Sequence, residues 1–131
     1  MKYNSSVTKS RKKNRKRYFQ SSSADKRKSM ISPLSKELKF KYNTSALPIR
    51  KEDEVIIMRG LFKGKNGKII QCQRKNFKVF VDKLVKTKTN KTNAFIPISP
   101  SNIMITKLFL SKERKVYLEK KKIEKKVNAY S

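Results

Sequence analysis

The sequence is poor in the residues that most enzymes use for catalysis and metal binding. It has no histidine, no tryptophan, one cysteine and only nine acidic residues among 131. Without histidine, the side chain that most often serves as general base and metal ligand is missing. A single cysteine excludes a disulfide within the chain and a cysteine-based zinc site. We therefore expect no enzyme activity, no catalytic residues, no bound metal, no cofactor and no small-molecule substrate.

Long apolar stretches are missing as well. The longest run, residues 55–58, has the length of a short strand. Spanning a bilayer takes roughly 20 consecutive apolar residues in a helix. We therefore expect no membrane insertion.

Positive charge is what the chain has in excess. Its 36 lysines and arginines give a formal net charge of +27. Such a charge opposes compaction unless a polyanion neutralises it. Nucleic acid is therefore the expected partner, and an anionic membrane surface is the alternative. A helix lying on a membrane would need a broad apolar face, and the C-terminal segment has only a narrow apolar stripe.

The distribution of charge and apolar residues divides the chain into three parts. Residues 1–50 have a net charge of +13 and are expected to form a basic N-terminal extension with short helices. Residues 51–110 have a net charge of +9 and hold most of the apolar residues that could form a core. Residues 111–131 have a net charge of +5 and are expected to form a basic helix over 112–126, capped by Ser111.

Serine and proline mark the expected elements of the first part. A helix over residues 8–18 is too basic to pack and would order mainly on a polyanion. Ser23 is expected to cap a helix over 24–31. Ser32 followed by proline predicts a helix over 33–41, and residues 46–49 are expected to be an extended link.

The middle part is predicted to be β structure. Phe77, Val79 and Val81 alternate with other residues at the period of two that a strand requires. Five short strands in about 55 residues fit a small, strongly bent barrel. The predicted strands are residues 55–59, 68–74, 77–82, 94–98 and 103–108, with a basic loop over 83–92.

Every glycine of the chain lies in one loop between two of these strands. Gly60, Gly64 and Gly67 surround Lys63 and Lys65. Glycine permits a positive φ or a close approach of the backbone to a partner. A basic loop flanked by glycine exposes backbone N–H and ammonium groups together, which suits a phosphate backbone. The alternative is a structural hairpin with incidental surface lysines.

A second basic motif precedes the first aromatic pair. Residues 9–17 include seven basic side chains, and Tyr18 and Phe19 follow them. Such a segment can enter RNA grooves, with arginine forking onto phosphates and the aromatic rings stacking on bases. The alternatives are a nuclear-localisation tail and a solvated linker.

Two features that could indicate catalysis have simpler interpretations. The acidic run over residues 52–54 is expected to be a solvated entry to a strand, because a hard cation needs several converging oxygen ligands. Cys72 is expected to be a small apolar core residue, since no histidine is available to activate it.

The glycine loop resembles a KOW motif, a strand followed by Gly-x-x-Lys-Gly-Lys-x-Gly-Lys and a second strand. Its flanks resemble one family in particular, the eukaryotic and archaeal form of the large-subunit KOW ribosomal protein. That family is number twenty-four in the universal naming and twenty-six in the eukaryotic one. The resemblance runs from residue 1 to about residue 122 and includes residues 1–4, 13–17, 32–38, 41–43, 48–51, 53–55, 100–103 and 105–108.

The resemblance implies an SH3-like barrel and a structural ribosomal protein. Its expected partners are large-subunit rRNA, at the 5′ domain near the peptide exit tunnel, and neighbouring large-subunit proteins. It further implies a role early in subunit assembly, a cytosolic ribosome location and, in a eukaryote, transit through the nucleus and nucleolus. We expect no homo-oligomer.

The residues that the resemblance assigns to RNA binding fall into three groups. The barrel loop is expected to contribute Arg59, Gly60, Lys63, Gly64, Lys65 and Lys68. The N-terminal arm is expected to contribute Arg11, Lys12, Lys13, Arg15, Lys16 and Arg17. Weaker contacts are expected from Ser35, Lys36, Arg50 and Lys51.

Two other kinds of binding protein are alternatives. KOW motifs also occur in transcription elongation factors, which normally have an adjoining polymerase-binding domain, and 131 residues leave no room for one. A free RNA-binding protein outside the ribosome would have the same charge and loop. Sedimentation with large subunits rather than with polymerase would favour the ribosomal interpretation.

Overall fold

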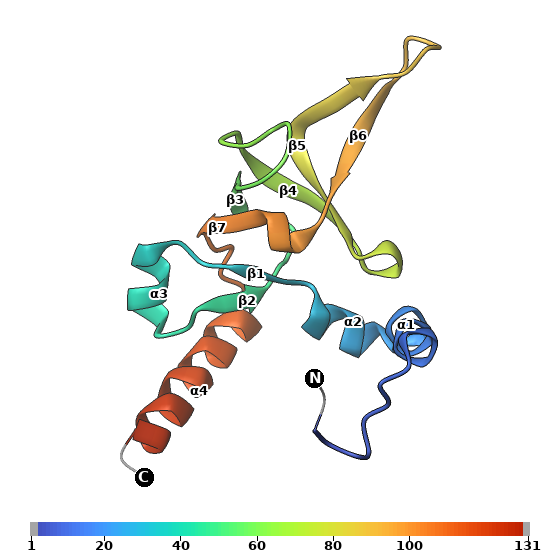
Figure 1. Ribbon diagram of the computed structural model, residues 1–131. Coiled ribbons are helices and arrows are strands. Elements are labelled where there is room, and N and C mark those ends of the chain that lie inside the picture. The colour runs from blue at the N-terminus through green and yellow to red at the C-terminus, as the bar shows by residue number, and fades with distance from the viewer. Residues whose placement is uncertain (1–2, 130–131) are drawn as a thin grey trace.

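The computed structural model describes residues 3–129 of the backbone and the side chains of residues 3–123. In chain order the elements are α1 (Arg11–Gln20), α2 (Ser23–Ser29), β1 (Ile31–Pro33), α3 (Lys36–Tyr42), β2 (Ala46–Pro48), β3 (Glu54–Ile57), β4 (Asn66–Gln73), the 3-10 turn η1 (Arg74–Asn76), β5 (Lys78–Thr87), β6 (Asn93–Ile98), the 3-10 turn η2 (Pro100–Asn102), β7 (Ile103–Lys107) and α4 (Lys112–Ala129). The helices near the two ends of the chain, α1, α2 and α4, all lie below the main group of strands in the view of Figure 1.

Five strands form the main sheet, in the order β6-β5-β4-β3-β7, and every neighbouring pair is antiparallel. Irregularities in the β4–β5 and β5–β6 registers interrupt the ladder, and such interruptions bend a strand and increase its twist. The two outer strands, β6 and β7, do not pair with each other, and β7 meets Leu34 in a single parallel bridge at Ile105. The predicted mainly β class with helical ends is confirmed, but the sheet curls without closing into a barrel.

The burial pattern predicted for the third strand, residues 77–82, is confirmed, but its start is wrong: β5 begins at Lys78, and Phe77 precedes it as the C-cap of η1 with a φ of +52°. Phe77, Val79 and Val81 are all buried, at 7%, 0% and 0% exposure. They face a core that also draws residues from outside the main sheet. The buried apolar residues are Met30, Leu34, Leu47, Ile49, Val55, Ile57, Ile69, Phe77, Val79, Val81, Leu84, Ile98, Ile103, Ile105 and Leu118. The core therefore depends on chain segments before residue 50 and after residue 110, and the division into three parts stays a prediction.

The expected helix over residues 33–41 is wrong at its start. Ser32 does not cap a helix; its hydroxyl donates a hydrogen bond of 2.6 Å to the carbonyl oxygen of Pro100. Pro33 ends β1, which pairs with β2 in a small two-stranded sheet. The residues expected to be an extended link are therefore a paired strand. Ser35 is the true N-cap of α3, because its hydroxyl accepts from the Leu38 N–H.

Other boundaries also differ from the sequence prediction. The basic loop expected over 83–92 is shorter, because β5 continues to Thr87 and β6 begins at Asn93. These two strands form a hairpin that extends away from the rest of the sheet (Figure 1). The second helix is capped by Ser22 rather than Ser23, and residue 31 belongs to β1.

Candidate nucleic-acid interface

The glycine loop spans residues 58–65, between β3 and β4. Its base is closed by two backbone hydrogen bonds, from Gly64 N–H to Ile57 O at 2.8 Å and from Ile57 N–H to Lys65 O at 3.0 Å. Gly60 and Gly64 have φ values of +96° and +85°. Residues that have a side chain rarely adopt such positive φ values, although a Cβ atom at either position would meet open space. Glycine is therefore required here by the backbone and not by crowding.

Gly67 has a different role, at the start of β4. A Cβ atom at this position would overlap the Cγ1 methyl of Val81 and would lie 3.0 Å from the carbonyl oxygen of Asp82. The absence of a side chain thus lets β4 pass close to β5 beside the loop. Gly60 and Gly64 thus allow the chain to reverse in the loop, and Gly67 allows β4 to pack closely against β5.

The loop presents its cations to solvent. Arg59, Lys63 and Lys65 are exposed, and none of them has an ion pair within the described part of the chain. The Lys65 ammonium lies 5.2 Å from the centre of the Phe62 ring. Leu61 is 92% exposed at the same loop. The arrangement offers three uncompensated charges and an apolar contact on a defined backbone.

Lys68 differs from the other loop cations. Its ammonium forms an ion pair with the carboxylate of Glu52 on the surface. The hydrogen bond from Lys68 lowers the pKa of Glu52, and the same contact raises the pKa of Lys68. An anionic ligand at Lys68 would have to compete with Glu52. Its place among the binding residues stays a prediction, as it does for the rest of the set.

The six predicted cations of the N-terminal arm lie on α1, where every one of them is exposed. This helix buries no residue. It is attached instead by Tyr18, whose ring stacks on Phe77 at 4.1 Å between centroids and 13° between planes. Phe19 meets Phe77 edge-on at 6.3 Å. The two rings expected to stack on bases are therefore partly engaged with the protein, although each stays about half exposed.

The four weaker candidates have mixed surroundings. Ser35 caps α3, and its N–H donates to the Ile105 carbonyl at 2.9 Å, so its hydroxyl and its N–H are both engaged in hydrogen bonds within the protein. Lys36 and Lys51 are exposed. Arg50 donates to the Ser111 hydroxyl at 3.3 Å. The pKa of Arg50 is lowered, mainly by its partial burial and to a smaller extent by the charges of Arg27 and Arg114.

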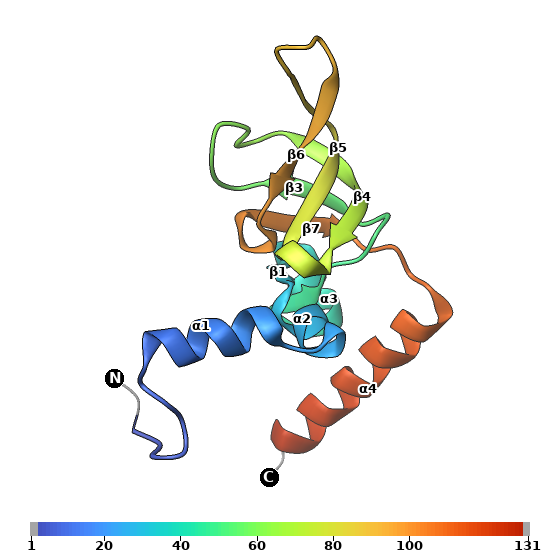
Figure 2. The same cartoon turned by 90° about the vertical axis from the view of Figure 1, so that its right-hand side faces the viewer.

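The predicted residues do not meet in one pocket. The loop between β3 and β4 lies at the end of the sheet opposite to α1 in both views (Figures 1 and 2). A shallow hollow of about 240 Å3 adjoins the loop and is lined in part by Arg59, Gly60 and Lys78. The two basic groups can therefore contact an extended polyanion at separate points.

Sequence reasoning missed a buried ion pair. Asp53, expected to be solvated, is 0% exposed, and Arg114 is 3% exposed. The Arg114 guanidinium donates to both carboxylate oxygens of Asp53 and to the carbonyls of Pro48 and Phe109. The Asp53 carboxylate also accepts from two backbone N–H groups. No local signal marks this pair, because its members come from distant parts of the chain.

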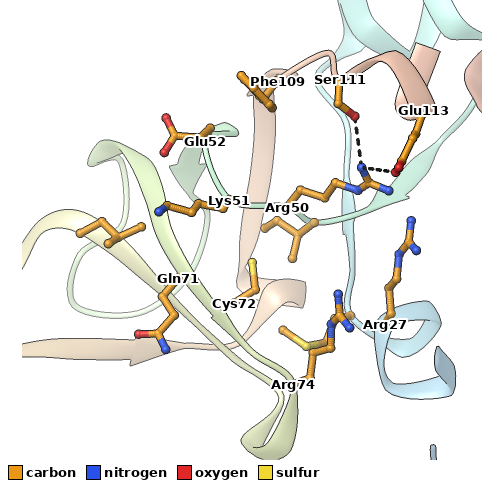
Figure 3. A pocket seen from close by; sticks show the side chains of 13 residues that line it. Arg27, Arg50, Lys51, Glu52, Gln71, Cys72, Arg74, Phe109, Ser111 and Glu113 are labelled. Carbon is orange, nitrogen blue, oxygen red and sulfur yellow. Dashed lines mark hydrogen bonds and ion pairs between the residues drawn. The ribbon is translucent and has the colours of Figure 1, made fainter. Parts of the chain in front are cut away.

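Sequence reasoning also missed a basic groove. It lies between α2, the turn before β3, β4 and the start of α4, and has a volume of about 1110 Å3 (Figure 3). Arg27 and Arg74 line it together with the predicted Arg50 and Lys51. Only the density of basic residues in the sequence pointed toward such a feature.

Nothing in the described part of the chain resembles a metal centre or a membrane span. No group of three or more histidine, cysteine or acidic side chains within it is placed to hold a metal ion. Over the same residues, no helix has both the length and the apolar character of a transmembrane segment. Burial raises the pKa of the Cys72 thiol to about 11, so the thiolate is scarce at neutral pH.

Comparison with known proteins places the chain in a family. Residues 8–121 match the family model that describes ribosomal proteins L26 of eukaryotes and their archaeal equivalents, numbered L24. Three similar proteins bear the name large ribosomal subunit protein uL24. They come from Dictyostelium discoideum, at 48% identity over 92% of this chain and 87% of the relative, Littorina littorea, at 46% over 92% and 85%, and Caenorhabditis elegans, at 42% over 92% and 85%.

These matches confirm the family expected from the KOW loop and its flanks. They extend beyond the sheet to α1, α2 and the beginning of α4. The family is a structural class and not an enzymatic one. The chain belongs to the ribosomal proteins of the large subunit, in the family that comprises L26 of eukaryotes and L24 of archaea.

Proposed function

We propose that the chain is a structural component of the large ribosomal subunit that binds the 5′ domain of large-subunit rRNA near the peptide exit tunnel. It joins the subunit early in assembly and contacts neighbouring large-subunit proteins. It works on the cytosolic ribosome after transit through the nucleus and nucleolus if the source is a eukaryote. The names of its relatives support the ribosomal part of this proposal.

The observation that carries RNA binding is the geometry of the glycine loop. Arg59, Lys63 and Lys65 are held on a short hairpin whose base is hydrogen-bonded. Their charges are not neutralised by carboxylates of the described residues. A phosphate backbone supplies the missing negative charge, and fixed cations select its position rather than its sequence.

The mechanism is electrostatic anchoring. Each phosphate that a lysine or arginine neutralises releases counterions, so the affinity falls as the salt concentration rises. The net charge of +27 and the separate positions of the loop and α1 favour several such contacts along one RNA. The folded sheet keeps the loop in a fixed geometry while the contacts form.

The test replaces Lys63 and Lys65 by alanine and measures binding of the full chain to a transcript of the rRNA 5′ domain. Loss of two phosphate contacts should weaken binding about tenfold at moderate salt and reduce the slope of log affinity against log salt by about two. The matched control replaces Lys112 and Lys115, two exposed lysines of α4, by alanine. We expect the control to change binding by less than the loop variant.

The result that would overturn the loop's role is equal binding by the loop variant and its control. A nearly flat salt dependence of the wild-type chain would reject phosphate anchoring altogether. Sedimentation of cell extract tests the ribosomal assignment independently of the loop. We expect the chain to migrate with large subunits, and migration with RNA polymerase would reject the assignment.

A further inference from the structure

The basic groove of Figure 3 collects cations from elements that are distant in the sequence. Arg27 comes from α2, Arg50 and Lys51 from the turn before β3, and Arg74 from η1 at the end of β4. Their side chains surround an open space, with the guanidinium groups of Arg27, Arg50 and Arg74 on the same side of the groove in the figure. Apolar residues form part of the lining, including the buried Met30 and Ile49.

The carboxylates that line the groove are already engaged. Glu52 pairs with Lys68, which is not among the lining residues, and Glu113 lies 4.0 Å from Arg50. Arg27, Lys51 and Arg74 have no ion pair within the described residues. Burial and the charges of Arg27 and Arg114 lower the pKa of Arg50, as expected where like charges crowd together. The groove therefore has positive charge that the described residues do not neutralise.

Two of the arginines are positioned before any ligand arrives. Arg74 donates to the Ser23 hydroxyl at 3.1 Å, which ties η1 to the start of α2. Arg50 donates to the Ser111 hydroxyl at 3.3 Å. The ammonium of Lys26 lies 5.6 Å from the centre of the Phe77 ring and strengthens the same α2–η1 contact. Binding at Arg74 would therefore cost less side-chain entropy than binding at a guanidinium group with no protein partner.

The shape and position of the groove favour a polymer over a small anion. It is open, and its volume of about 1110 Å3 is more than a single phosphate fills. Only two residues, Ser21 and Ser22, separate the basic helix α1 from α2, so an anionic chain that contacts α1 can continue into the groove. Guanidinium groups match phosphate oxygens with two parallel hydrogen bonds.

We propose that the groove between α2, η1 and the turn before β3 binds an RNA backbone segment, with Arg27, Lys51 and Arg74 contacting phosphates. This inference rests on the proposed function and adds a third anchoring point to the loop and α1. We expect the contact to be with phosphates more than with base edges, since four of the lining side chains are cations and the two lining carboxylates, Glu52 and Glu113, already lie beside Lys68 and Arg50.

The first experiment replaces Arg27 and Arg74 by glutamine in the full chain. Its matched control replaces Lys28 and Lys75, which are their immediate neighbours on the same two elements, are exposed and do not line the groove. Both variants lose two positive charges. Binding to the rRNA 5′ domain transcript should fall about tenfold for R27Q/R74Q and clearly less for K28Q/K75Q, with the salt slope of the first reduced by about two.

A second experiment reports on the groove without any substitution in it. Cys72 is the only cysteine of the chain and lines the groove, half-buried beside the arginines (Figure 3). Its modification by methyl methanethiosulfonate, followed by mass spectrometry, measures access to the groove. Saturating RNA transcript should slow this modification at least several-fold in the wild-type chain. Slowing should persist in K63A/K65A when enough RNA is added to saturate it, because the groove contact is separate from the loop.

The outcomes separate this inference from the proposed function. If the wild-type chain binds the transcript but R27Q/R74Q equals K28Q/K75Q, or if RNA leaves the rate at Cys72 unchanged, the groove inference is overturned and the function stands. If the wild-type chain fails to bind the transcript, the proposed function fails with it. If an acidic peptide such as poly-glutamate protects Cys72 and the RNA does not, the groove binds protein and the inference is equally overturned. Circular dichroism of both double variants checks that each is folded.

Discussion

The two terminal helices are alike in sequence and different in how they attach. Both α1 and α4 follow a serine and are rich in basic residues. Ser10 makes no side-chain cap, and α1 buries none of its residues. Ser111 accepts from the Arg114 N–H at 3.3 Å, and the described part of α4 buries Arg114 and Leu118. Two helices rich in basic residues therefore attach differently: α1 lies on the surface, and α4 contributes buried side chains to the domain.

The difference shows that some basic residues stabilise the fold, while others remain exposed and available to bind a ligand. The six cations of α1 are all exposed, and the helix contacts the rest of the domain through Tyr18, which stacks on Phe77, and Phe19, which meets the same ring edge-on. In α4, one arginine is withdrawn from solvent to satisfy Asp53. We infer that α4 shares the stability of the whole domain, while α1 is held locally and can open without unfolding the rest.

Removing the buried ion pair should have the largest effect. In Arg114→Met the Asp53 carboxylate stays buried without its partner, and a lone buried charge is strongly unfavourable. We expect the free energy of unfolding to fall by about 3–5 kcal/mol. Urea unfolding followed by far-UV circular dichroism measures it.

The matched control for this variant is Glu113→Gln, which removes an exposed charge one residue earlier in α4. Surface changes of this kind usually alter stability by less than about 0.5 kcal/mol. Equal unfolding midpoints for the two variants would show that α4 is attached no more firmly than α1.

A smaller effect is expected from the apolar contact of α4. Leu118 is 4% exposed and belongs to the core cluster. Leu118→Ala should lower the free energy of unfolding by about 2 kcal/mol, near the low end for leucine because the site lies where the helix meets the domain surface. Thermal and urea unfolding measure the change. Val116→Ala, at a position 50% exposed on the same helix, is the control and should change stability by less than about 0.5 kcal/mol.

The smallest effect on global stability is expected at α1. Tyr18→Ala removes the ring stacked on Phe77, and such aromatic pairs contribute about 0.5–1.5 kcal/mol. We expect hydrogen exchange of the α1 amides to accelerate while the exchange of the strands is unchanged. Tyr18→Phe keeps the ring and should keep the protection. Accelerated exchange in the main sheet as well would mean that α1 is part of the same cooperative unit as α4.

Much of the sheet could be predicted because its signals are local. The alternation of Val79 and Val81 with their neighbours and the loop glycines Gly60 and Gly64 depend on residues close along the chain. The start of α3 could not be predicted, because Ser32 and Pro33 have the sequence of a helix start. Ser32 instead bonds to Pro100, 68 residues away, and the pairing of β1 with β2 decides the local conformation.

In the candidate site too, features with a local sequence signal could be predicted and features that depend on distant contacts could not. The loop cations follow from glycine spacing and the family resemblance, and the structure leaves Lys63 and Lys65 free of ion pairs within its described residues. The place of Arg27 and Arg74 in one groove could not be read from the sequence, because it follows from the docking of α2 on η1. The burial of Asp53 was missed for a related reason: an acidic residue between two others is usually solvated unless a distant partner enters the core.

The partnership of Asp53 with Arg114 also has a consequence for the order in which the chain folds. The two residues are 61 positions apart in the sequence. The pairing of β3 with β7 also joins distant parts of the chain. During synthesis, β3 and β4 are made long before β7 and Arg114. Contacts of such large sequence separation form slowly because a long loop must close first. The domain can therefore complete its core only after the residues up to Leu118 have been made, and until Arg114 is available Asp53 remains in water.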